Sequence, residues 1–227
     1  MGSQELDLSE LELDRHAPDA AAVLHRALID LCFDRGFAAV SAEALCQRAD
    51  LSPATFRSRH GSLERYFVQA CRDEIRRYRG LAAAAASEAE DWRGRLRAVA
   101  YALYRSLGGD ERRRHFILIE ARAGERSALL IDRALSSLYD LIDEGRAQPA
   151  APARLTRATA EFLGGAAFNE VYLASGRRSS LPREEDVVPK MMYLTVLPYL
   201  GGAEALKELT TPPPQPQPYL QMVGAAG

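Results

Sequence analysis

Apolar residues recur along most of the chain at the spacing expected of helices. Between Val23 and Cys32 each apolar residue has others one, four or five positions further along the chain, a spacing that places them in a single stripe on a helix. Gly36 is the expected end of this helix. A second long stripe runs from Tyr66 to Tyr78, and the alanine-rich run 81–90 extends that helix or begins a short link. Later stripes predict helices at about 92–107, 111–122, 126–145, 153–175 and 186–200. No segment reads convincingly as a strand, so the pattern predicts an all-α protein.

Two short helices stand out between the long ones. Ser41 can cap a helix over residues 41–49, and Glu43 in its first turn suits the helix dipole. Ser52 followed by Pro53 places a capping hydroxyl and a first-turn proline at the start of a helix over 52–59. The turn between them is short enough to predict a helix-turn-helix.

The second short helix has an exposed face that suits DNA. Phe56 is its only large apolar residue and is the expected anchor, while small, hydroxyl and arginine side chains face outward. Such side chains can approach base edges and phosphates in a major groove. The alternative is a solvated amphipathic helix that binds no nucleic acid. The candidate DNA contacts are Ser41, Arg48, Ser52, Pro53, Ala54, Thr55, Arg57, Ser58, Arg59, His60 and Ser62.

Charge is distributed unevenly along the chain. The net charge is −2, but residues 41–79 carry eight arginines against five acids, and five acids with no base precede Arg15. A basic segment beside an acidic arm indicates an anionic partner for the former, although arginines can also simply solvate helix faces.

The sequence around this segment resembles the TetR/AcrR family of bacterial transcriptional regulators. The resemblance runs through "ALIDLCFDRGFAAVSAEALCQRADLSPATFRSRHGSLERYF", residues 27–67, with weaker echoes in "FILIEARAGERS" and "PYLGGAEA". It implies an N-terminal three-helix DNA-binding domain with a helix-turn-helix and a C-terminal helical ligand-binding and dimerisation domain. It also implies a homodimer that binds a palindromic double-stranded DNA operator, as a repressor that a small lipophilic ligand releases.

Several residues depart from the family pattern. Asp50 and Ala54 stand where the family usually has glycine, and Arg57 and His60 replace aromatic residues of the recognition helix. Leu63 replaces a phosphate-binding lysine, and a leucine cannot contact phosphate by charge. The second hypothesis is therefore a helical ligand-binding dimer with weakened or lost DNA binding.

The expected domain order follows from these patterns. It comprises an acidic arm at 1–18, a DNA-binding domain at 19–80, a ligand-binding and dimerisation domain at 81–208 and a proline-rich tail at 209–227. Two late segments, "EFLGGAAFNEVYLAS" and "DVVPKMMYLTVLPYL", carry small and adaptable apolar residues that fit the dimer interface of the family. The alternative is that both segments bury against their own chain.

Aromatic and polar residues in the second domain are candidates for a ligand cavity, because such cavities combine apolar walls with a few placed polar groups. Each of them can equally be plain core. Glu120 is either a buried carboxylate that needs a partner or an exposed partner of a nearby arginine. The candidates are Tyr101, Tyr104, Phe116, Glu120, Tyr139, Phe168, Asn169 and Tyr172.

Other classes of function find little support. The histidines show no metal-binding repeat, and the chain has no Gly-x-Ser-x-Gly elbow, phosphate-binding glycine loop or Cys-x-x-Cys, so neither an enzyme nor a cofactor is expected. Cys32, Cys46 and Cys71 lie in apolar helical patterns, which predicts buried thiols. No apolar run approaches the length of a membrane span, and we expect a cytoplasmic protein with no membrane partner.

Overall fold

The computed structural model describes residues 17–215, which divide into two compact units after Phe67. Within this range every regular element is helical, which confirms the all-α class. The acidic arm predicted at the N-terminus, apart from its last two residues, and the part of the predicted proline-rich tail beyond residue 215 lie outside the described residues. The units, called unit 1 and unit 2 below, divide earlier than the domain boundary expected after residue 80, because contacts in unit 2 begin within a continuous helix.

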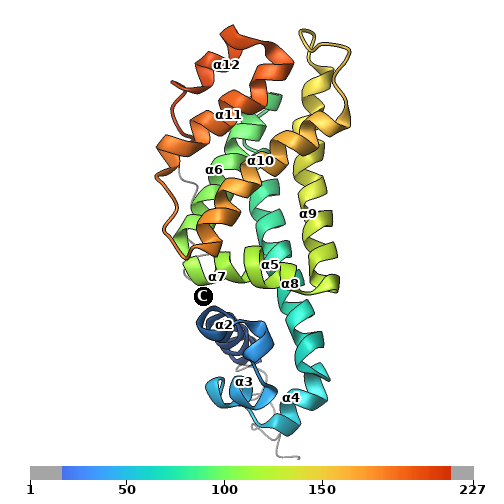
Figure 1. Cartoon of the computed structure of the whole chain (residues 1–227), viewed down its shortest axis with the longest axis vertical. Helices are drawn as coiled ribbons and strands as arrows, with labels where there is room; N and C mark the ends of the chain where they lie inside the picture. Colours follow the sequence, from blue (N-terminus) through green and yellow to red (C-terminus); the bar gives the residue numbers. More distant parts are fainter. Residues whose placement is uncertain (1–16, 216–227) are drawn as a thin grey trace, which may run out of the picture. The chain divides into compact units, whose positions relative to one another are not determined.

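Unit 1 contains the expected pair of short helices. Its elements are α2 (Ala17–Arg35), a 3-10 turn (Phe37–Ala39), α3 (Ala42–Arg48), α4 (Pro53–His60) and the first turn of α5 (Leu63–Ala86). Gly36 ends α2 with φ of 77°, a backbone conformation that favours glycine. The rings of Phe37 and Phe67 stack with centroids 3.9 Å apart, and α3 and α4 contact each other as a helix-turn-helix requires. The α2, α3 and α4 segments are seen in Figure 1.

Helix α5 continues without a break from Leu63 to Ala86. The alanine-rich run therefore extends this helix as far as Ala86, and a turn at residues 87–90 ends it. The division between the two units falls inside α5, so one helix contributes residues to both.

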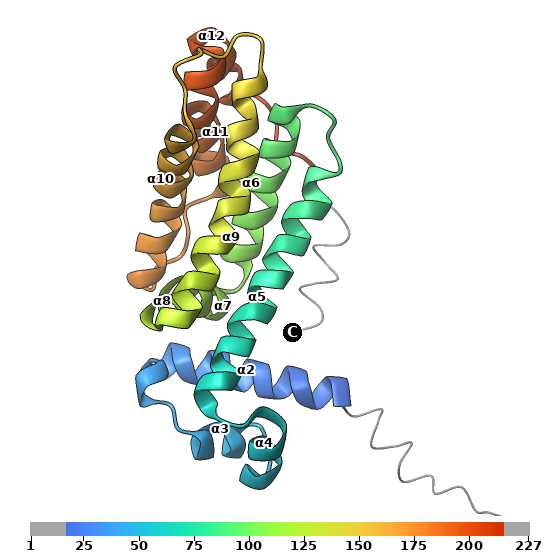
Figure 2. The same cartoon turned by 90° about the vertical axis from the view of Figure 1, so that its right-hand side faces the viewer.

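Unit 2 is a bundle of long helices. They are α6 (Trp92–Gly109), α7 (Glu111–His115), a π-helical turn (Phe116–Glu120), α8 (Ala121–Ala123), α9 (Glu125–Asp143), a 3-10 turn (Glu144–Ala147), α10 (Arg157–Gly176), α11 (Glu184–Leu200) and α12 (Gly202–Glu208). In two views α6, α9, α10 and α11 run alongside one another and α7 and α8 cross one end of this bundle (Figures 1 and 2). The helices expected from the apolar stripes are therefore present, with ends displaced by a few residues.

A compact aromatic cluster packs between α6, the 3-10 turn after α9 and α11 in unit 2. Trp92 is buried, donates its indole N–H to the carbonyl oxygen of Leu141 at 2.8 Å, and meets the ring of Tyr199 with centroids 5.3 Å apart. Gly145 passes so close that an added Cβ would lie 2.6 Å from the Trp92 ring. Glycine at this position allows the 3-10 turn to pack on the aromatic pair.

Helix α12 was not expected from the sequence. Gly201, at φ of 81°, separates it from α11. A Gly-Gly pair usually indicates the end of a helix, so the sequence does not predict that a short helix follows. Its Glu208 side chain is fully buried and accepts hydrogen bonds from Arg93 Nε at 2.7 Å and Arg97 Nε at 3.1 Å. Two arginines of α6 thus hold α12 in place, since a buried carboxylate requires paired charge.

The remaining general predictions concern thiols and membranes. Cys32, Cys46 and Cys71 are free and buried, as expected, and burial with the nearby Glu74 charge raises the pKa of the Cys71 thiol to about 12. None of the helices in the described range is both long and apolar enough to cross a bilayer.

Candidate functional site

Helix α4 is defined by the capping chemistry of its sequence. The Ser52 hydroxyl accepts a hydrogen bond from the Thr55 backbone N–H at 3.1 Å and lies 2.8 Å from the Thr55 hydroxyl. Pro53 occupies the first helical position, and Gly61 ends the helix at φ of 80°. These signals fix both ends of a two-turn helix and so determine which side chains point outward.

The outward face of α4 is polar and basic. Phe56 is 2% exposed and meets the Tyr66 ring edge-on at 5.7 Å, so it anchors the helix as predicted. Thr55 is half-buried, while the remaining side chains of the face are exposed: Pro53, Ala54, Arg57, Ser58 and Arg59. Among the described residues no ion pair is formed by Arg57 or Arg59, so both guanidinium groups face water.

Three of the four serines proposed as DNA contacts, all except Ser58, accept hydrogen bonds from backbone N–H groups at the starts of helices. Ser41 Oγ accepts from the Ala44 N–H at 3.1 Å, and Ser62 Oγ accepts from the Arg65 N–H at 3.2 Å, as Ser52 does at α4. A hydroxyl that accepts in this way still has its own hydrogen to donate. The Ser52 hydroxyl shares a hydrogen bond with the Thr55 hydroxyl, and the Ser62 hydroxyl, after the Glu64 backbone, lowers the pKa of the Glu64 carboxyl. Capping is therefore compatible with a phosphate contact at Ser41, whereas Ser52 and Ser62 must first turn from these partners.

Two further candidates are engaged with their own chain. Arg48 Nη2 lies 3.6 Å from Asp30 Oδ2, which partly neutralises its charge. The His60 ring packs against Phe56 and Tyr66, with centroids 5.2 and 4.6 Å away. Desolvation, and then the nearby Arg59 charge, lower the pKa of His60, which favours the neutral ring. His60 is thus foremost a packing residue of α4.

The structure gives a physical account of one departure from the family pattern. Asp50 sits between α3 and α4 at φ of 51°, the left-handed conformation in which glycine is usual. Aspartate and asparagine tolerate this conformation better than other residues. Asp50 therefore keeps the turn of the helix-turn-helix without glycine. Leu63 is half-buried at the start of α5.

One basic residue near this surface was not among the candidates. Arg65 is exposed on the first turn of α5, and its guanidinium lies over Gly61, 2.9 Å from where a Cβ would stand. Its position at the end of α4 makes it a further candidate for a phosphate contact. Arg65 is one of the eight arginines of residues 41–79, but the sequence alone does not show that it lies close to α4.

A large apolar cavity lies within unit 2. Its volume is about 720 Å³, and its walls come from α5, α6, the π-helical turn, α9, α10 and α11. On α5 the wall includes Ala82, Ala83 and Ala86, whose small side chains leave the space open. Across from them lie larger aliphatic and thioether side chains, including Leu103, Leu138, Val171, Met191 and Met192. Such a cavity suits an apolar small molecule.

The predicted ligand residues divide into several groups. Tyr104 and Phe168 line the cavity. Tyr101 and Phe116 are buried outside its lining, Tyr139 packs against Gly164, and Tyr172 stacks on Phe168 with centroids 6.1 Å apart. Asn169 is exposed on α10. Six of the eight therefore lie off the cavity wall, and their role in binding stays a prediction.

Glu120 is buried, not exposed beside an arginine. It is 9% exposed at the end of the π-helical turn, and its Oε1 lies 3.1 Å from His115 Nε2. The prediction of an exposed Glu120 paired with an arginine is therefore wrong, because the π-helical turn places this carboxylate beside His115, five residues earlier. The first alternative, a buried carboxylate with a partner, is the one observed.

No protein-family model and no curated protein sequence matches the chain. Among solved structures, a TetR-like transcriptional regulator from Rhodococcus sp. RHA1 has a TM-score of 0.62 at 16% identity, over 78% of this chain and 94% of its own. A TetR family transcription regulator from Marinobacter aquaeolei VT8 has a TM-score of 0.64 at 16% identity, over 81% and 96% of the two chains. The fatty acid degradation regulator FadR from Bacillus halodurans has a TM-score of 0.65 at 15% identity, over 76% and 96%. The chain therefore has the fold of TetR-like transcriptional regulators.

Proposed function

We propose that the chain is a DNA-binding transcriptional regulator of the TetR/AcrR family and not an enzyme. It acts in the cytoplasm as a homodimer that represses genes by holding a palindromic operator, and it releases the operator when a small lipophilic ligand binds. The observation that carries this proposal is the exposed basic face of α4, built on a helix-turn-helix and anchored by Phe56. The shared fold of solved transcriptional regulators supports it.

The DNA contacts follow from the chemistry of that face. Arg57 and Arg59 are exposed and can reach phosphates or guanine edges, while Ala54 and Ser58 leave the backbone free to approach bases. Ser41 can donate to a phosphate oxygen from its capping position, and Ser52 and Ser62 can do so when their hydroxyls turn from Thr55 and Glu64. A basic contact at Arg57 takes the place of the family's aromatic phosphate contact.

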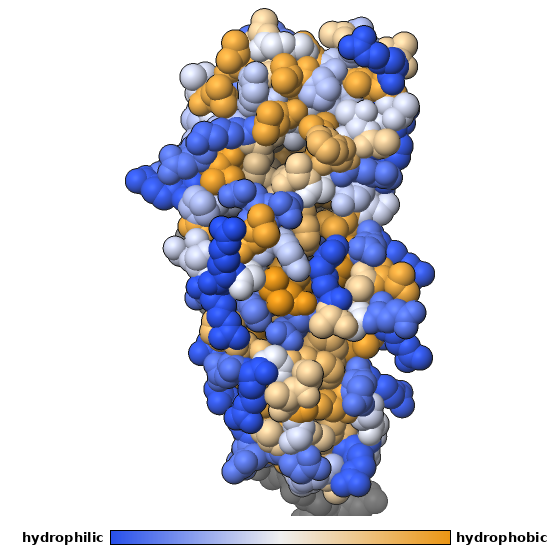
Figure 3. All heavy atoms as spheres, in the orientation of Figure 1, coloured by the Kyte–Doolittle hydropathy of each residue, from blue (hydrophilic) through white to orange (hydrophobic). Residues whose placement is uncertain are grey.

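The dimer rests on the outer faces of α10 and α11. Phe162 is 76% exposed, Leu194 is 57% exposed and Leu173 is 42% exposed, and an added Cβ at Gly165 would meet no atom within 4 Å. In the view of Figure 3, apolar side chains lie among polar ones over these helices. Large apolar side chains gathered on two adjacent helices indicate a protein interface, and a two-fold dimer would present two recognition helices to successive major grooves. A Gly165→Arg chain that sediments as a monomer, beside a Gly109→Arg chain that remains dimeric, would support this seam.

The experiment that tests DNA binding begins with selection of duplexes from a random library by the full chain. The selected duplex is then titrated over a range of salt concentrations with the wild type, Arg57→Ala, Arg59→Ala and the control Arg133→Ala, which changes an exposed arginine of α9. We expect Arg57→Ala and Arg59→Ala to weaken binding, and at least one to flatten the salt dependence by about one phosphate contact. The control should behave as the wild type.

Two outcomes would reject the assignment. If Arg57→Ala and Arg59→Ala keep the wild-type affinity and salt slope, α4 is not the DNA-reading helix. If no duplex is selected at low salt, the chain is better described as a ligand-binding dimer without DNA affinity. This is the second hypothesis from the sequence, which rests on Leu63 standing in place of a phosphate-binding lysine.

A further inference from the structure

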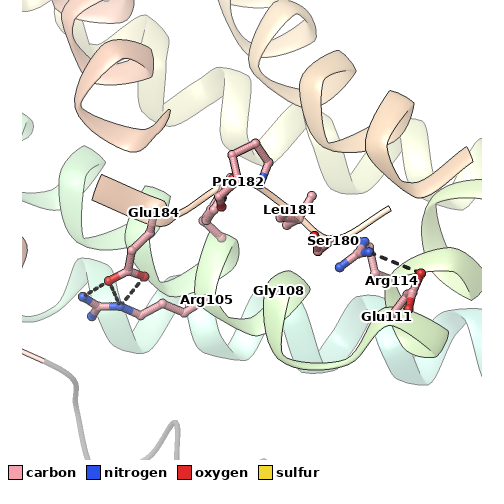
Figure 4. A pocket seen from close by; sticks show the side chains of 9 residues that line it. Arg105, Gly108, Glu111, Arg114, Ser180, Leu181, Pro182 and Glu184 are labelled. Carbon is pink, nitrogen blue, oxygen red and sulfur yellow. Dashed lines mark hydrogen bonds and ion pairs between the residues drawn. The ribbon is translucent and has the colours of Figure 1, made fainter. Parts of the chain in front are cut away.

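A second, smaller pocket lies beside the apolar cavity in unit 2. Its volume is about 300 Å³, and it is bounded by the C-terminal half of α6, by α7, by residues 180–182 of the segment before α11 and by Glu184, the first residue of α11 (Figure 4). Charged side chains form a large part of its lining: Arg105 and Arg114 with Glu111 and Glu184. The much longer lining of the large cavity includes only two charged side chains, Arg76 and Arg79. The wall of the small pocket therefore combines charged groups with a few apolar ones, such as Leu181 and Pro182, and can hold the polar end of a ligand.

The two arginines of this pocket differ in how their charge is balanced. Arg105 forms a close pair with Glu184, with its Nη2 2.7 Å from Oε1 and its Nε 2.8 Å from Oε2. Arg114 is only 1% exposed, yet its nearest carboxylate in the described chain, Glu111, lies 4.0 Å away and is 44% exposed. The Arg105 charge is therefore paired at close range, whereas the buried Arg114 charge is paired only at 4.0 Å with a carboxylate that is partly in water.

The hydrogen bonds of Arg114 hold it rigidly. Its Nε donates to Ser175 Oγ at 3.1 Å, its Nη1 to the Leu107 carbonyl at 3.0 Å and its Nη2 to the Ser179 carbonyl at 2.8 Å. These acceptors are neutral and use three of the five N–H donors of the guanidinium. A buried cation is costly unless an anion lies close to it, and the close acceptors of Arg114 are neutral while Glu111 lies 4.0 Å away. A second anion in the pocket would therefore be bound favourably.

One side chain lines both the small pocket and the large cavity. Tyr104 lines the small pocket and the large cavity, and its hydroxyl donates to the Pro182 carbonyl at 2.9 Å. The polar pocket and the apolar cavity are thus adjacent across a single tyrosine, which is fixed by the segment that covers the pocket. A molecule with a polar end and an apolar end could occupy both once this tyrosine turns.

We propose that the ligand of this chain is an amphipathic monoanion of the carboxylate type, whose head binds Arg114 in the small pocket and whose apolar chain lies in the large cavity. This inference rests on the proposed function, because it names the class of the releasing ligand. The guanidinium fork matches a carboxylate geometrically, and the aliphatic wall of the cavity suits a hydrocarbon chain.

The test uses three probes with the same chain and different heads: octanoate, octan-1-ol and octyltrimethylammonium. Binding to the full chain is measured by calorimetry without DNA. We expect octanoate to bind about tenfold or more tightly than octan-1-ol, the effect of one charge-assisted hydrogen bond. Equal affinities for octanoate and octan-1-ol, tightest binding of the cationic probe, or no binding of any probe would each overturn the proposal.

Variants locate the head. Ser180 is exposed on the rim of the small pocket, so Ser180→Asp adds a negative charge there and Ser180→Asn is its neutral match. Ser180→Asp should reduce octanoate affinity by about tenfold and leave octan-1-ol unchanged, while Ser180→Asn should change neither. Arg114→Gln should remove the preference for octanoate, with its folding checked by circular dichroism. If Ser180→Asp leaves the preference for octanoate intact, the head does not bind in this pocket.

A DNA titration separates this inference from the proposed function. If octanoate shows the expected preferences but the chain binds no duplex, or binds a duplex that octanoate does not release, the ligand class stands and the regulatory function fails. If the selected duplex binds while octanoate shows no preference over octan-1-ol, the DNA-binding function stands and the inference fails.

Discussion

The two units of this chain differ in where their chemistry lies. Unit 1 presents its candidate groups on an exposed surface, with Phe56 buried beneath and Arg57 and Arg59 in water. Unit 2 encloses its candidate site, a cavity of about 720 Å³ whose wall is mostly aliphatic. A surface site depends on which side chains are present, whereas an enclosed site depends also on which side chains are small. This difference explains both what each unit can bind and how each responds to substitution.

The largest expected effect is on the filled core of unit 1. Phe56→Ala removes the only large buried side chain of α4 and should lower the free energy of unfolding of unit 1 by about 3–5 kcal/mol. Chemical denaturation followed by circular dichroism measures the loss, with Arg59→Ala as a surface control that stays within about 0.5 kcal/mol. A loss below about 1 kcal/mol would mean that α4 is not anchored by Phe56.

A smaller effect distinguishes the inner and outer faces of α10 in unit 2. An added Cβ at Gly164 would lie 2.6 Å from the Tyr139 ring, whereas one at Gly165 would meet no atom within 4 Å. Gly164→Ala should therefore destabilise by about 1–3 kcal/mol through overpacking. Gly165→Ala should stabilise by about 0.5–1 kcal/mol through helix propensity. Thermal unfolding of the pair checks both signs, and equal shifts would contradict the packing of α10 on α9.

The smallest expected effect is a pH dependence confined to unit 1. Burial lowers the folded-state pKa of His60 below its usual value near 6.5, so the unfolded chain binds the proton more readily. The stability that this provides is present above the unfolded pKa of about 6.5 and is lost as the pH falls from there through the lower folded-state pKa. His60→Phe keeps a ring against Phe56 and Tyr66 without titrating. Unfolding midpoints of both chains between pH 7.5 and 5.5, a range of about two units around that pKa, should show a smaller acid loss in the variant; parallel curves would exclude His60 as a cause.

The sequence predicted unit 1 more fully than unit 2 for a physical reason. Caps, turns and an isolated phenylalanine define α3 and α4 locally, so Ser41, Ser52 and Phe56 could be assigned their structural roles without a fold. The cavity of unit 2 depends on distant helices whose small residues face each other, and the alanines of α5 indicated only helix propensity. The sequence pattern therefore indicates aromatic residues as ligand candidates, whereas most of the cavity wall is aliphatic. The sequence did not predict helix α12, because the glycines at its start are residues that usually end a helix.

The central claim is that a ligand in unit 2 governs DNA binding by unit 1, with α5, which contributes residues to both, as the connecting element. Only a ligand that prefers the DNA-incompetent state can release an operator, and the same factor must then appear in its own affinity. The direct test measures operator affinity with and without saturating octanoate, and octanoate affinity with and without operator. We predict reciprocal weakening of about 5- to 150-fold in both titrations. A ligand that fills the cavity yet leaves operator affinity unaltered would contradict the claim.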